Sequence, residues 1–347
     1  ADVVKLSSNE NPFPALPAVQ AAVSAAVGGL NRYPDMFATG LVHDISWFHK
    51  WVDDGVVVGN GSTALIEKIL QAAVTPGGEV VLPWRSFEAY PIAVQAAGGA
   101  AVKVPLNADG SHNLPGLLSA VTERTRALLL CSPNNPTGTA LPLEDITRIL
   151  EAARGHGPML GAEIGSPARA SDCVVVIDEA YAEFRRPGVP SALELVGPDN
   201  PHLAVTRTMS KAFGAAGLRL GYLAADRALV DALRVVRLPY HLSAVTQAAA
   251  LAALSHRDEL MAQVASLRDE RDAFVDWLRS QGLSAHESDA NFVLFGPFPD
   301  REAVWQALLD AGVLIRVVGP EGFLRASIGT PEEMARLRAA LTSAIGR

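Results

Sequence analysis

Apolar runs alternate with helical patterns over most of the chain. The runs that we interpret as strands lie at 80–82, 101–104, 127–131, 174–177, 203–206 and 220–224. Short apolar runs bounded by turn residues are typical of strands buried on both faces. Their alternation with helical segments predicts an α/β fold, with a three-layer large domain whose mostly parallel sheet is flanked by helices.

The pattern changes towards the C-terminus. Helical periodicity dominates residues 245–278, which predicts long helices that link and cover a smaller C-terminal α+β domain. A last helix begins at Thr330, with Pro331 in its first turn and Glu333 completing a capping box. A chain of 347 residues suits two domains. We therefore divide it into an N-terminal arm (1–30), a large domain (31–237) and a small C-terminal domain (238–347).

Composition and charge narrow the class of partner. The formal charge of −8, without any basic run, argues against nucleic acid. No apolar stretch reaches the length of a membrane span, and no signal peptide is visible. Cys131 and Cys173 lie in apolar runs, as free thiols do, which favours a reducing, cytoplasmic setting. The eight histidines show no ligand-like spacing, so we expect no metal site.

One buried strand ends at an acidic residue. Residues 174–177 are four β-branched residues in succession, which is typical of a strand in the middle of an α/β sheet. Asp178 follows at the edge where open α/β sheets bind ligands, and Tyr181 comes three residues later. Asp178 is therefore a candidate ligand-binding carboxylate. The alternative is that it caps a helix after the strand, because aspartate is a favoured cap residue.

A lysine follows the next strand along the chain. Residues 203–206 lead into Thr208, Ser210 and Lys211, and Arg219 comes eight residues after the lysine. The hydroxyls and the guanidinium suit a phosphate dianion, and a lysine held at a strand end can form a Schiff base with an aldehyde. Taken alone, Lys211 reads as a solvated lysine. The Asp178 segment upstream is what favours a functional role.

Two further segments follow apolar runs in the same way. In residues 132–138, Asn135 is well placed to hydrogen-bond a ligand, and Pro136 is a candidate for a cis peptide bond. Ser62 and Thr63 come after a Gly-rich turn and begin a helical pattern, where backbone N–H groups are exposed to an anion. Each segment alone is an ordinary turn. Their order along the chain is what makes them informative.

In this order the segments resemble the class I/II aminotransferases of fold type I and, within them, the histidinol-phosphate aminotransferase branch. The resemblance covers nearly the whole chain. It also includes residues 8–12, 31–35, 238–241, 289–292 and 324–333. Residues 154–169 are longer than the connection that the resemblance leads us to expect, and their Gly, Pro and Ala content predicts a surface loop.

The resemblance implies a pyridoxal 5′-phosphate enzyme and a role for each matching residue. Lys211 becomes the Schiff-base lysine, Asp178 the partner of the pyridinium nitrogen, and Tyr181 and Asn135 ligands of the phenolic oxygen. Phe87 would stack on the ring. The residues implied to hold the cofactor phosphate are Ser62, Thr63, Thr208, Ser210, Arg219 and, from the other subunit, Tyr33. A homodimer is therefore the implied working unit.

Substrate recognition is expected in the small domain. Residues 313–318 and 323–327 read as strands joined by a four-residue connection, which places Arg316 opposite Arg325. Like charges so placed repel unless an anion lies between them; the alternative is that one arginine is solvated. The resemblance makes Arg325 the residue that holds the substrate carboxylate or the phosphate that replaces it, and it adds Asn9 to the substrate contacts.

The sequence thus predicts a transfer of the amino group from histidinol phosphate to 2-oxoglutarate, giving imidazole acetol phosphate and glutamate, as in histidine biosynthesis. Residues 84–91 instead look like aromatic amino-acid aminotransferases, so phenylalanine or tyrosine is the alternative donor. A decarboxylase or lyase on the same fold is a further alternative. A cofactor-binding regulatory domain would require an attached DNA-binding module, and none is visible.

Overall fold

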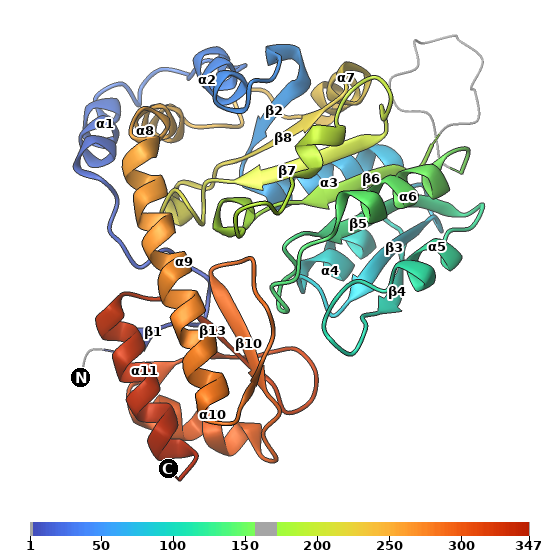
Figure 1. Ribbon diagram of the computed structural model, residues 1–347. Helices are drawn as coiled ribbons and strands as arrows, with labels where there is room; N and C mark the ends of the chain where they lie inside the picture. Colours follow the sequence, from blue (N-terminus) through green and yellow to red (C-terminus); the bar gives the residue numbers. More distant parts are fainter. Residues whose placement is uncertain (1–2, 157–171, 347) are drawn as a thin grey trace.

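The computed structural model describes residues 3–156 and 172–346 (Figure 1). Most of the predicted surface loop at 154–169 lies outside the described residues. In the part that is described, a large sheet with its helices and a smaller sheet with its helices are stacked along the long helix α9 (Arg257–Ser280). We call these two parts the large domain and the small domain. The boundaries at residues 30 and 237 remain a proposal.

The large domain is built on a seven-stranded sheet. Its order is β2 (Val56–Gly59), β8 (Gly221–Ala225), β7 (Leu203–Thr208), β6 (Val174–Asp178), β5 (Thr125–Cys131), β3 (Glu79–Trp84) and β4 (Ala100–Pro105). Neighbouring strands are parallel except where β8 pairs with β2 and β7. The mostly parallel sheet predicted from the sequence is confirmed.

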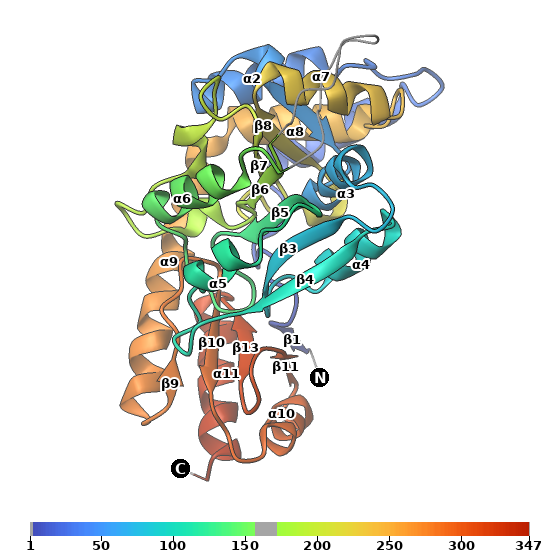
Figure 2. The ribbon, with the colours of Figure 1, turned by 90° about the vertical axis from the view of Figure 1, so that its right-hand side faces the viewer.

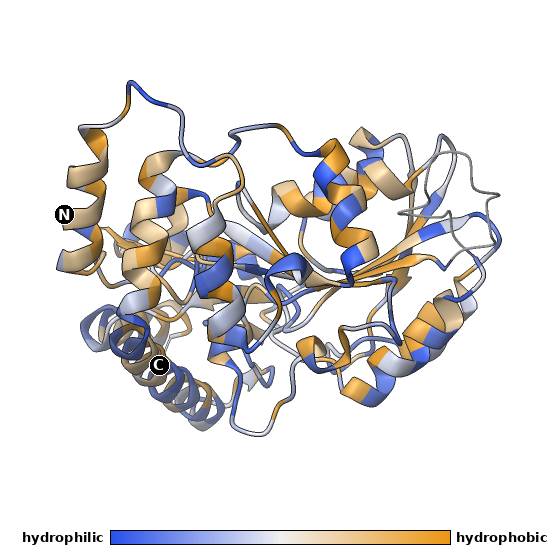
Figure 3. Ribbon diagram, turned by 90° about the horizontal axis from the view of Figure 1, so that it is seen from above, coloured by the Kyte–Doolittle hydropathy of each residue, from blue (hydrophilic) through white to orange (hydrophobic). Residues whose placement is uncertain are grey.

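Helices cover both faces of this sheet. One face packs on α3 (Ser62–Ala73), α4 (Ala89–Ala96) and α7 (Arg227–Val236), and the other on α5 (Leu114–Ser119) and α6 (Leu143–Ala153). Alternate residues of β5 contribute to the two cores, which is why the strand reads as continuously apolar. The covering helices carry both hydrophobic and hydrophilic residues (Figure 3), as amphipathic helices at a surface do.

The remaining helices of the large domain lie at its β2 edge. There α1 (Pro17–Val27) and α2 (Thr39–His49) pack on α8 (Ala244–Ser255), which leads into α9. Short 3₁₀ turns are η1 (Asp53–Gly55), η2 (Ala182–Phe184), η3 (Ala192–Leu195) and η4 (Ala216–Leu218). No helix in the described ranges has the length and apolar character needed to cross a membrane.

The small domain holds a four-stranded antiparallel sheet (Figure 2). Its order is β12 (Arg316–Val317), β13 (Leu324–Ser327), β10 (Phe292–Gly296) and β9 (Ser284–Ala285). The sheet packs with α9, α10 (Arg301–Asp310) and α11 (Pro331–Ala344). The capping box predicted for the last helix is confirmed, because the Thr330 and Glu333 side chains each accept a hydrogen bond from the other's backbone N–H.

The predicted strand 313–318 is wrong in one respect. It is two short strands, β11 (Val313–Leu314) and β12, separated at Ile315. The reason is that the two halves pair with different partners, β11 with β1 (Val4–Lys5) of the N-terminal arm and β12 with β13. The connection between β12 and β13 is also longer than the four residues predicted, because β12 ends at Val317 and β13 begins at Leu324. The predicted register is nevertheless confirmed, with Arg316 directly opposite Arg325.

Candidate functional site

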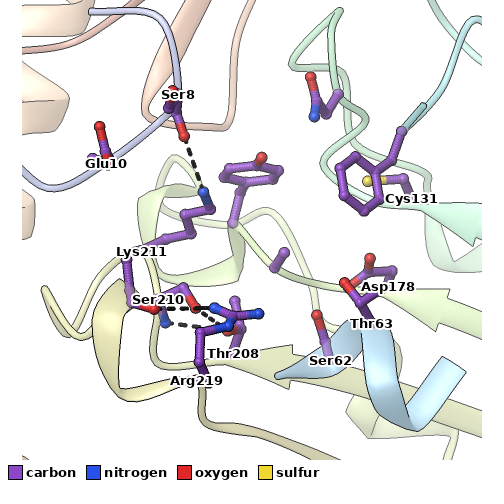
Figure 4. A pocket seen from close by; sticks show the side chains of 15 residues that line it. Ser8, Glu10, Ser62, Thr63, Cys131, Asp178, Thr208, Ser210, Lys211 and Arg219 are labelled. Atoms are coloured by element: carbon purple, nitrogen blue, oxygen red, sulfur yellow. Dashed lines mark hydrogen bonds between the residues drawn. The ribbon is translucent and has the colours of Figure 1, made fainter. Parts of the chain in front are cut away.

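A cavity lies at the carboxyl ends of β6 and β7, between the large domain and the N-terminal arm (Figure 4). Parallel strands β5, β6 and β7 bring their ends to one edge, so segments far apart in the sequence converge there. Of the residues predicted to hold the cofactor, all but one line this cavity: Ser62, Thr63, Phe87, Asn135, Asp178, Tyr181, Thr208, Ser210, Lys211 and Arg219.

The Asp178 carboxylate is a buried part of the cavity lining. It is 3% exposed and accepts hydrogen bonds from the Tyr90 hydroxyl at 2.8 Å and the Thr206 hydroxyl at 3.0 Å. Burial raises the pKa of Asp178 to about 6, and the hydrogen bonds from Tyr90 and Thr206 oppose that shift. Above pH 6 the carboxylate is therefore ionised and held in a fixed direction, ready to pair with a cationic ring nitrogen.

Lys211 reaches into the same cavity from the loop after β7. Its Nζ donates a hydrogen bond to the Ser8 carbonyl at 3.2 Å and lies 5.9 Å from the centre of the Tyr181 ring. Burial, with a smaller contribution from the positive charge of Arg325, lowers the pKa of Lys211 from 10.5 to about 8. A neutral amine, which is the nucleophilic form, is thus accessible near neutral pH.

Hydroxyls and a guanidinium gather beside the start of α3. Arg219 Nη1 donates to the Ser210 hydroxyl at 3.3 Å, and the Thr208 hydroxyl lies 2.9 Å from that of Ser210. A Cβ on Gly61 would come within 2.6 Å of Arg219 Nη2, so a residue without a side chain lets the guanidinium close over the helix start. Backbone N–H groups, hydroxyls and a guanidinium together form a cradle for a phosphate.

A second cavity continues from the first towards the small domain. Its lining includes Lys211, Asn9, Arg316 and Arg325, so the structure brings both predicted arginines to the lysine. Arg325 is buried, and it donates to Asn135 Oδ1 at 2.5 Å and to the Ser7 carbonyl at 2.7 Å. The Nε of Arg325 is buried without a hydrogen-bond partner in the described structure.

Asn9 and Tyr33 differ in how the structure places them. Asn9 is buried, and its side-chain amide donates a hydrogen bond to the Tyr181 hydroxyl at 3.0 Å. This contact ties the N-terminal arm to the cofactor end of the cavity. Tyr33 lines neither cavity: it is 82% exposed and stacks on Tyr240 with 4.6 Å between ring centres. Its predicted role concerns a second subunit.

Sequence reasoning missed three residues that the structure adds. Tyr90 and Thr206 bind the Asp178 carboxylate, and Glu88 lines the second cavity beside Arg316. Thr206 could have been found, since it is polar within an apolar strand and pairs in register with Asp178. Tyr90 and Glu88 gave no such signal, because their contacts depend on how α4 packs against the sheet and the small domain.

In the described ranges, no group of three or more His, Cys, Asp or Glu side chains is placed to hold a metal ion. The two cysteines are buried and free. The Asn135–Pro136 peptide bond is cis, as the sequence indicated.

A cavity-lining lysine with a lowered pKa, a buried carboxylate and a group of anion-binding side chains at the carboxyl edge of an α/β sheet are typical of an enzyme that acts on small molecules. The sequence profile of the family described as aminotransferase class I and II matches residues 1–160 and 162–341. The chain therefore belongs to this aminotransferase family.

Individual relatives carry two different names. The chain is 50% identical to a histidinol-phosphate aminotransferase of Thermobifida fusca, over 99% of this chain and 90% of that protein. It is 40% identical to an aromatic amino acid aminotransferase of Streptomyces coelicolor, over 94% and 87% of the two chains. The crystal structure of histidinol-phosphate aminotransferase from Sinorhizobium meliloti in complex with pyridoxal 5′-phosphate superposes with a TM-score of 0.87, at 27% identity, covering 99% of this chain and 91% of that one.

Proposed function

We propose that this chain is a pyridoxal 5′-phosphate-dependent aminotransferase that transfers the amino group of histidinol phosphate to 2-oxoglutarate. The products are imidazole acetol phosphate and glutamate. The observation that carries the donor assignment is the cross-strand pair Arg316 and Arg325, which lines the cavity that Lys211 also lines. Two guanidiniums on one side of a reactive lysine suit a donor that carries a phosphate. The 50% identical relative of that name supports the same donor.

The residues of the first cavity fit the cofactor. The cradle of Ser62, Thr63, Thr208, Ser210 and Arg219 supplies hydrogen-bond donors for a phosphate, and the distant Asp178 supplies an anion for a ring nitrogen. Phe87 lines both cavities and offers a ring face between them. When bound, pyridoxal phosphate supplies an aldehyde that bonds to amines and a pyridine ring that accepts the electron pair left by proton loss.

Each side chain then has a defined task. Asp178, when ionised, would hold the proton on the pyridine nitrogen. Asn135 and Tyr181 would orient the ring by hydrogen bonds to its phenolic oxygen, and Asn9 holds the Tyr181 hydroxyl in place. The Lys211 amine, with its lowered pKa, would remove the proton from the substrate Cα and deliver it to the former aldehyde carbon of the cofactor.

Arg325 and Arg316 orient the substrate from the small domain. Arg325 is fixed by Asn135 and the Ser7 carbonyl, so its guanidinium has a set place in the lining of the second cavity. It would hold the carboxylate of 2-oxoglutarate or the phosphate of the donor, and Arg316 would add a second guanidinium for the phosphate. The two half-reactions then use one substrate site in turn.

The working unit in this proposal is a homodimer in the cytoplasm. The support for it is an exposed aromatic group, formed by Tyr33 stacked on Tyr240 together with Phe37 under Arg237. In a dimer, Tyr33 would reach the cofactor phosphate of the other subunit. The two buried, unpaired thiols are in keeping with a reducing compartment.

The second candidate donor is an aromatic amino acid, favoured by the 40% identical aromatic amino acid aminotransferase. Steady-state rates for histidinol phosphate and for phenylalanine, measured on one preparation with 2-oxoglutarate as acceptor, separate the two donors. Good activity with phenylalanine and no turnover of histidinol phosphate would transfer the assignment to the aromatic donor.

The variant Arg316→Ala tests the donor site itself. Each charge-assisted hydrogen bond contributes about 1.5–3 kcal/mol, so losing one guanidinium should lower kcat/KM for histidinol phosphate about tenfold to a hundredfold. Phenylalanine should lose less, because its monoanionic carboxylate is held by Arg325. Arg325→Ala should impair both donors. Arg279→Ala, which removes an exposed guanidinium paired with Glu287 outside both cavities, is the matched control. Equal losses for both donors in Arg316→Ala would place the phosphate elsewhere.

Tyr90→Phe tests the support of Asp178. Loss of the Tyr90 hydrogen bond removes an interaction that lowers the pKa of the carboxyl, so this pKa should rise. The acid limb of kcat/KM should then move to higher pH, since the ionised carboxylate is the active form, and turnover at neutral pH should fall by about tenfold. Tyr222→Phe, which breaks a buried 2.8 Å hydrogen bond to His49 away from both cavities, is the control. An unmoved acid limb would contradict this role of Tyr90.

A further inference from the structure

An ion pair joins the two domains beside the paired arginines. Glu88 directly precedes α4 of the large domain, and Arg316 lies in β12 of the small domain. Their side chains meet with 3.1 Å between Glu88 Oε2 and Arg316 Nη2, and both line the cavity that contains Arg325. Glu88 and Arg316 do not line the first cavity, where the cofactor cradle lies. Their contact therefore belongs to the substrate end of the site, and we look for its role there.

The two arginines of the pair are held very differently. Arg325 is 6% exposed and has two nitrogens committed to Asn135 and the Ser7 carbonyl. The side chains of Arg316 and Glu88 are 53% and 52% exposed. An ion pair in contact with water contributes little to stability, whereas a ligand anion between two guanidiniums makes several charge-assisted hydrogen bonds. A bound anion can therefore displace the Glu88 carboxylate from Arg316.

Glu88 also sets the charge of this cavity. Of the described side chains that line it, the cations are Lys211, Arg316 and Arg325, and the carboxylate is Glu88 alone. With Glu88 in place the arginine pair has a net charge of about +1, and without it about +2. The displaced Glu88 carboxylate stays close to the cavity, and its repulsion of a ligand grows in proportion to the charge of that ligand, so it is about twice as large for a dianion as for a monoanion.

We propose that Glu88 determines the charge selectivity of the substrate site, acting as a counter-ion that Arg316 exchanges for the anionic group of the donor. Glu88 thereby lowers the affinity that the two guanidiniums would otherwise have for dianionic phosphates. The same site can then release a phosphate and accept the monoanionic carboxylate of 2-oxoglutarate. This inference rests on the proposed function in one respect, namely that the substrate anion binds at Arg316 and Arg325.

Glu88→Gln in the holoenzyme tests this role, because the substitution removes the charge and keeps the shape of a half-exposed side chain. The probes are inorganic phosphate and acetate as competitive inhibitors against the better amino donor, at a pH of about 8, where phosphate is mainly dianionic. The inhibition constant should fall about tenfold for phosphate and only about threefold for acetate, because the effect scales with ligand charge. The ratio of kcat/KM for histidinol phosphate over phenylalanine should rise with it.

Two comparisons make the result specific. Glu287→Gln, a carboxylate of similar exposure paired with Arg279 away from the cavity, should leave both inhibition constants unchanged. In the double variant Glu88→Gln/Arg316→Ala, the gain in phosphate binding should disappear. A phosphate inhibition constant that is unchanged or raised in Glu88→Gln would overturn the inference, since Glu88 would then be inert or would serve to orient Arg316. A gain that persists without Arg316 would overturn it as well.

The proposed function and this inference fail in different ways. If Arg316→Ala alone leaves phosphate inhibition and donor preference unchanged, the donor phosphate is not bound at the arginine pair, and both the proposed site and the exchange at Arg316 are wrong. If Arg316→Ala weakens phosphate while Glu88→Gln changes nothing, the site stands and only the selectivity role of Glu88 is overturned.

Discussion

Replacement of Lys211 by alanine is expected to abolish turnover while the cofactor stays bound. The reason is that the two functions lie on different side chains. In the proposed function, Lys211 would supply the amine that bonds to the aldehyde and moves the proton at the substrate Cα, so its removal should lower turnover on the order of ten-thousandfold or more. The phosphate would be held separately, by the hydroxyls and Arg219 that line the cavity at the start of α3 and after the end of β7.

Borohydride reduction gives the direct measurement. The purified protein should be yellow, and reduction should attach the pyridoxyl group to Lys211, as mapped by peptide mass spectrometry. The Lys211→Ala protein should retain cofactor through gel filtration, but borohydride should attach none of it to the protein, because no covalent bond to a lysine remains. Lys68→Ala, a lysine of α3 whose Nζ bonds to Gln71, serves as control and should remain active. A pyridoxyl label on another lysine would contradict the proposed role of Lys211 as the Schiff-base lysine.

The sequence carried enough information for the residues that follow strands. Asp178 and Lys211 come at or just after the ends of β6 and β7, which begin with the apolar runs 174–177 and 203–205 because both faces of the sheet are covered. Neighbouring parallel strands end at one edge, so adjacency in space follows from the order of the apolar runs. The same logic predicted the Arg316–Arg325 pair, since a hairpin fixes its register locally.

What the sequence could not supply depends on packing between elements. The break at Ile315 arises because β11 adds to the N-terminal strand β1, more than three hundred residues earlier in the chain. The Glu88 contact depends on the placement of the small domain against α4, and the Tyr90 contact on the packing of α4 against the sheet. No local pattern encodes these distances. The Glu88 and Tyr90 contacts involve charged groups of the site, Arg316 and Asp178, and neither Glu88 nor Tyr90 was given a role by the resemblance to the family.

Asp178→Asn is expected to keep the fold and the bound cofactor but to slow proton removal from the substrate. An amide cannot hold the positive charge on the pyridine nitrogen, so the ring becomes a weaker acceptor for the electron pair left at Cα. Loss of one preorganised electrostatic partner typically costs about a hundredfold to a thousandfold in rate. Asn keeps the shape of the side chain but only one acceptor oxygen, so one of the two hydroxyls of Tyr90 and Thr206 keeps its acceptor. The other hydroxyl can rotate to accept from the new amide NH2, so the thermal stability should change little.

Single-turnover kinetics with the amino donor alone isolate this step from cofactor loss and from the second half-reaction. The rate of the absorbance change of the cofactor should fall by the hundredfold to thousandfold given above. This rate should recover in part when the cofactor is replaced by an analogue methylated on the ring nitrogen, because that nitrogen then carries its positive charge permanently. Asp226→Asn is the matched control, because Asp226 also follows a strand of the large sheet. It follows β8, which runs antiparallel to β7 and so ends at the opposite edge, where Asp226 caps α7. A near-normal rate in Asp178→Asn would contradict the role of Asp178, and a slow rate that the methylated cofactor leaves unchanged would show that the damage lies elsewhere in the site.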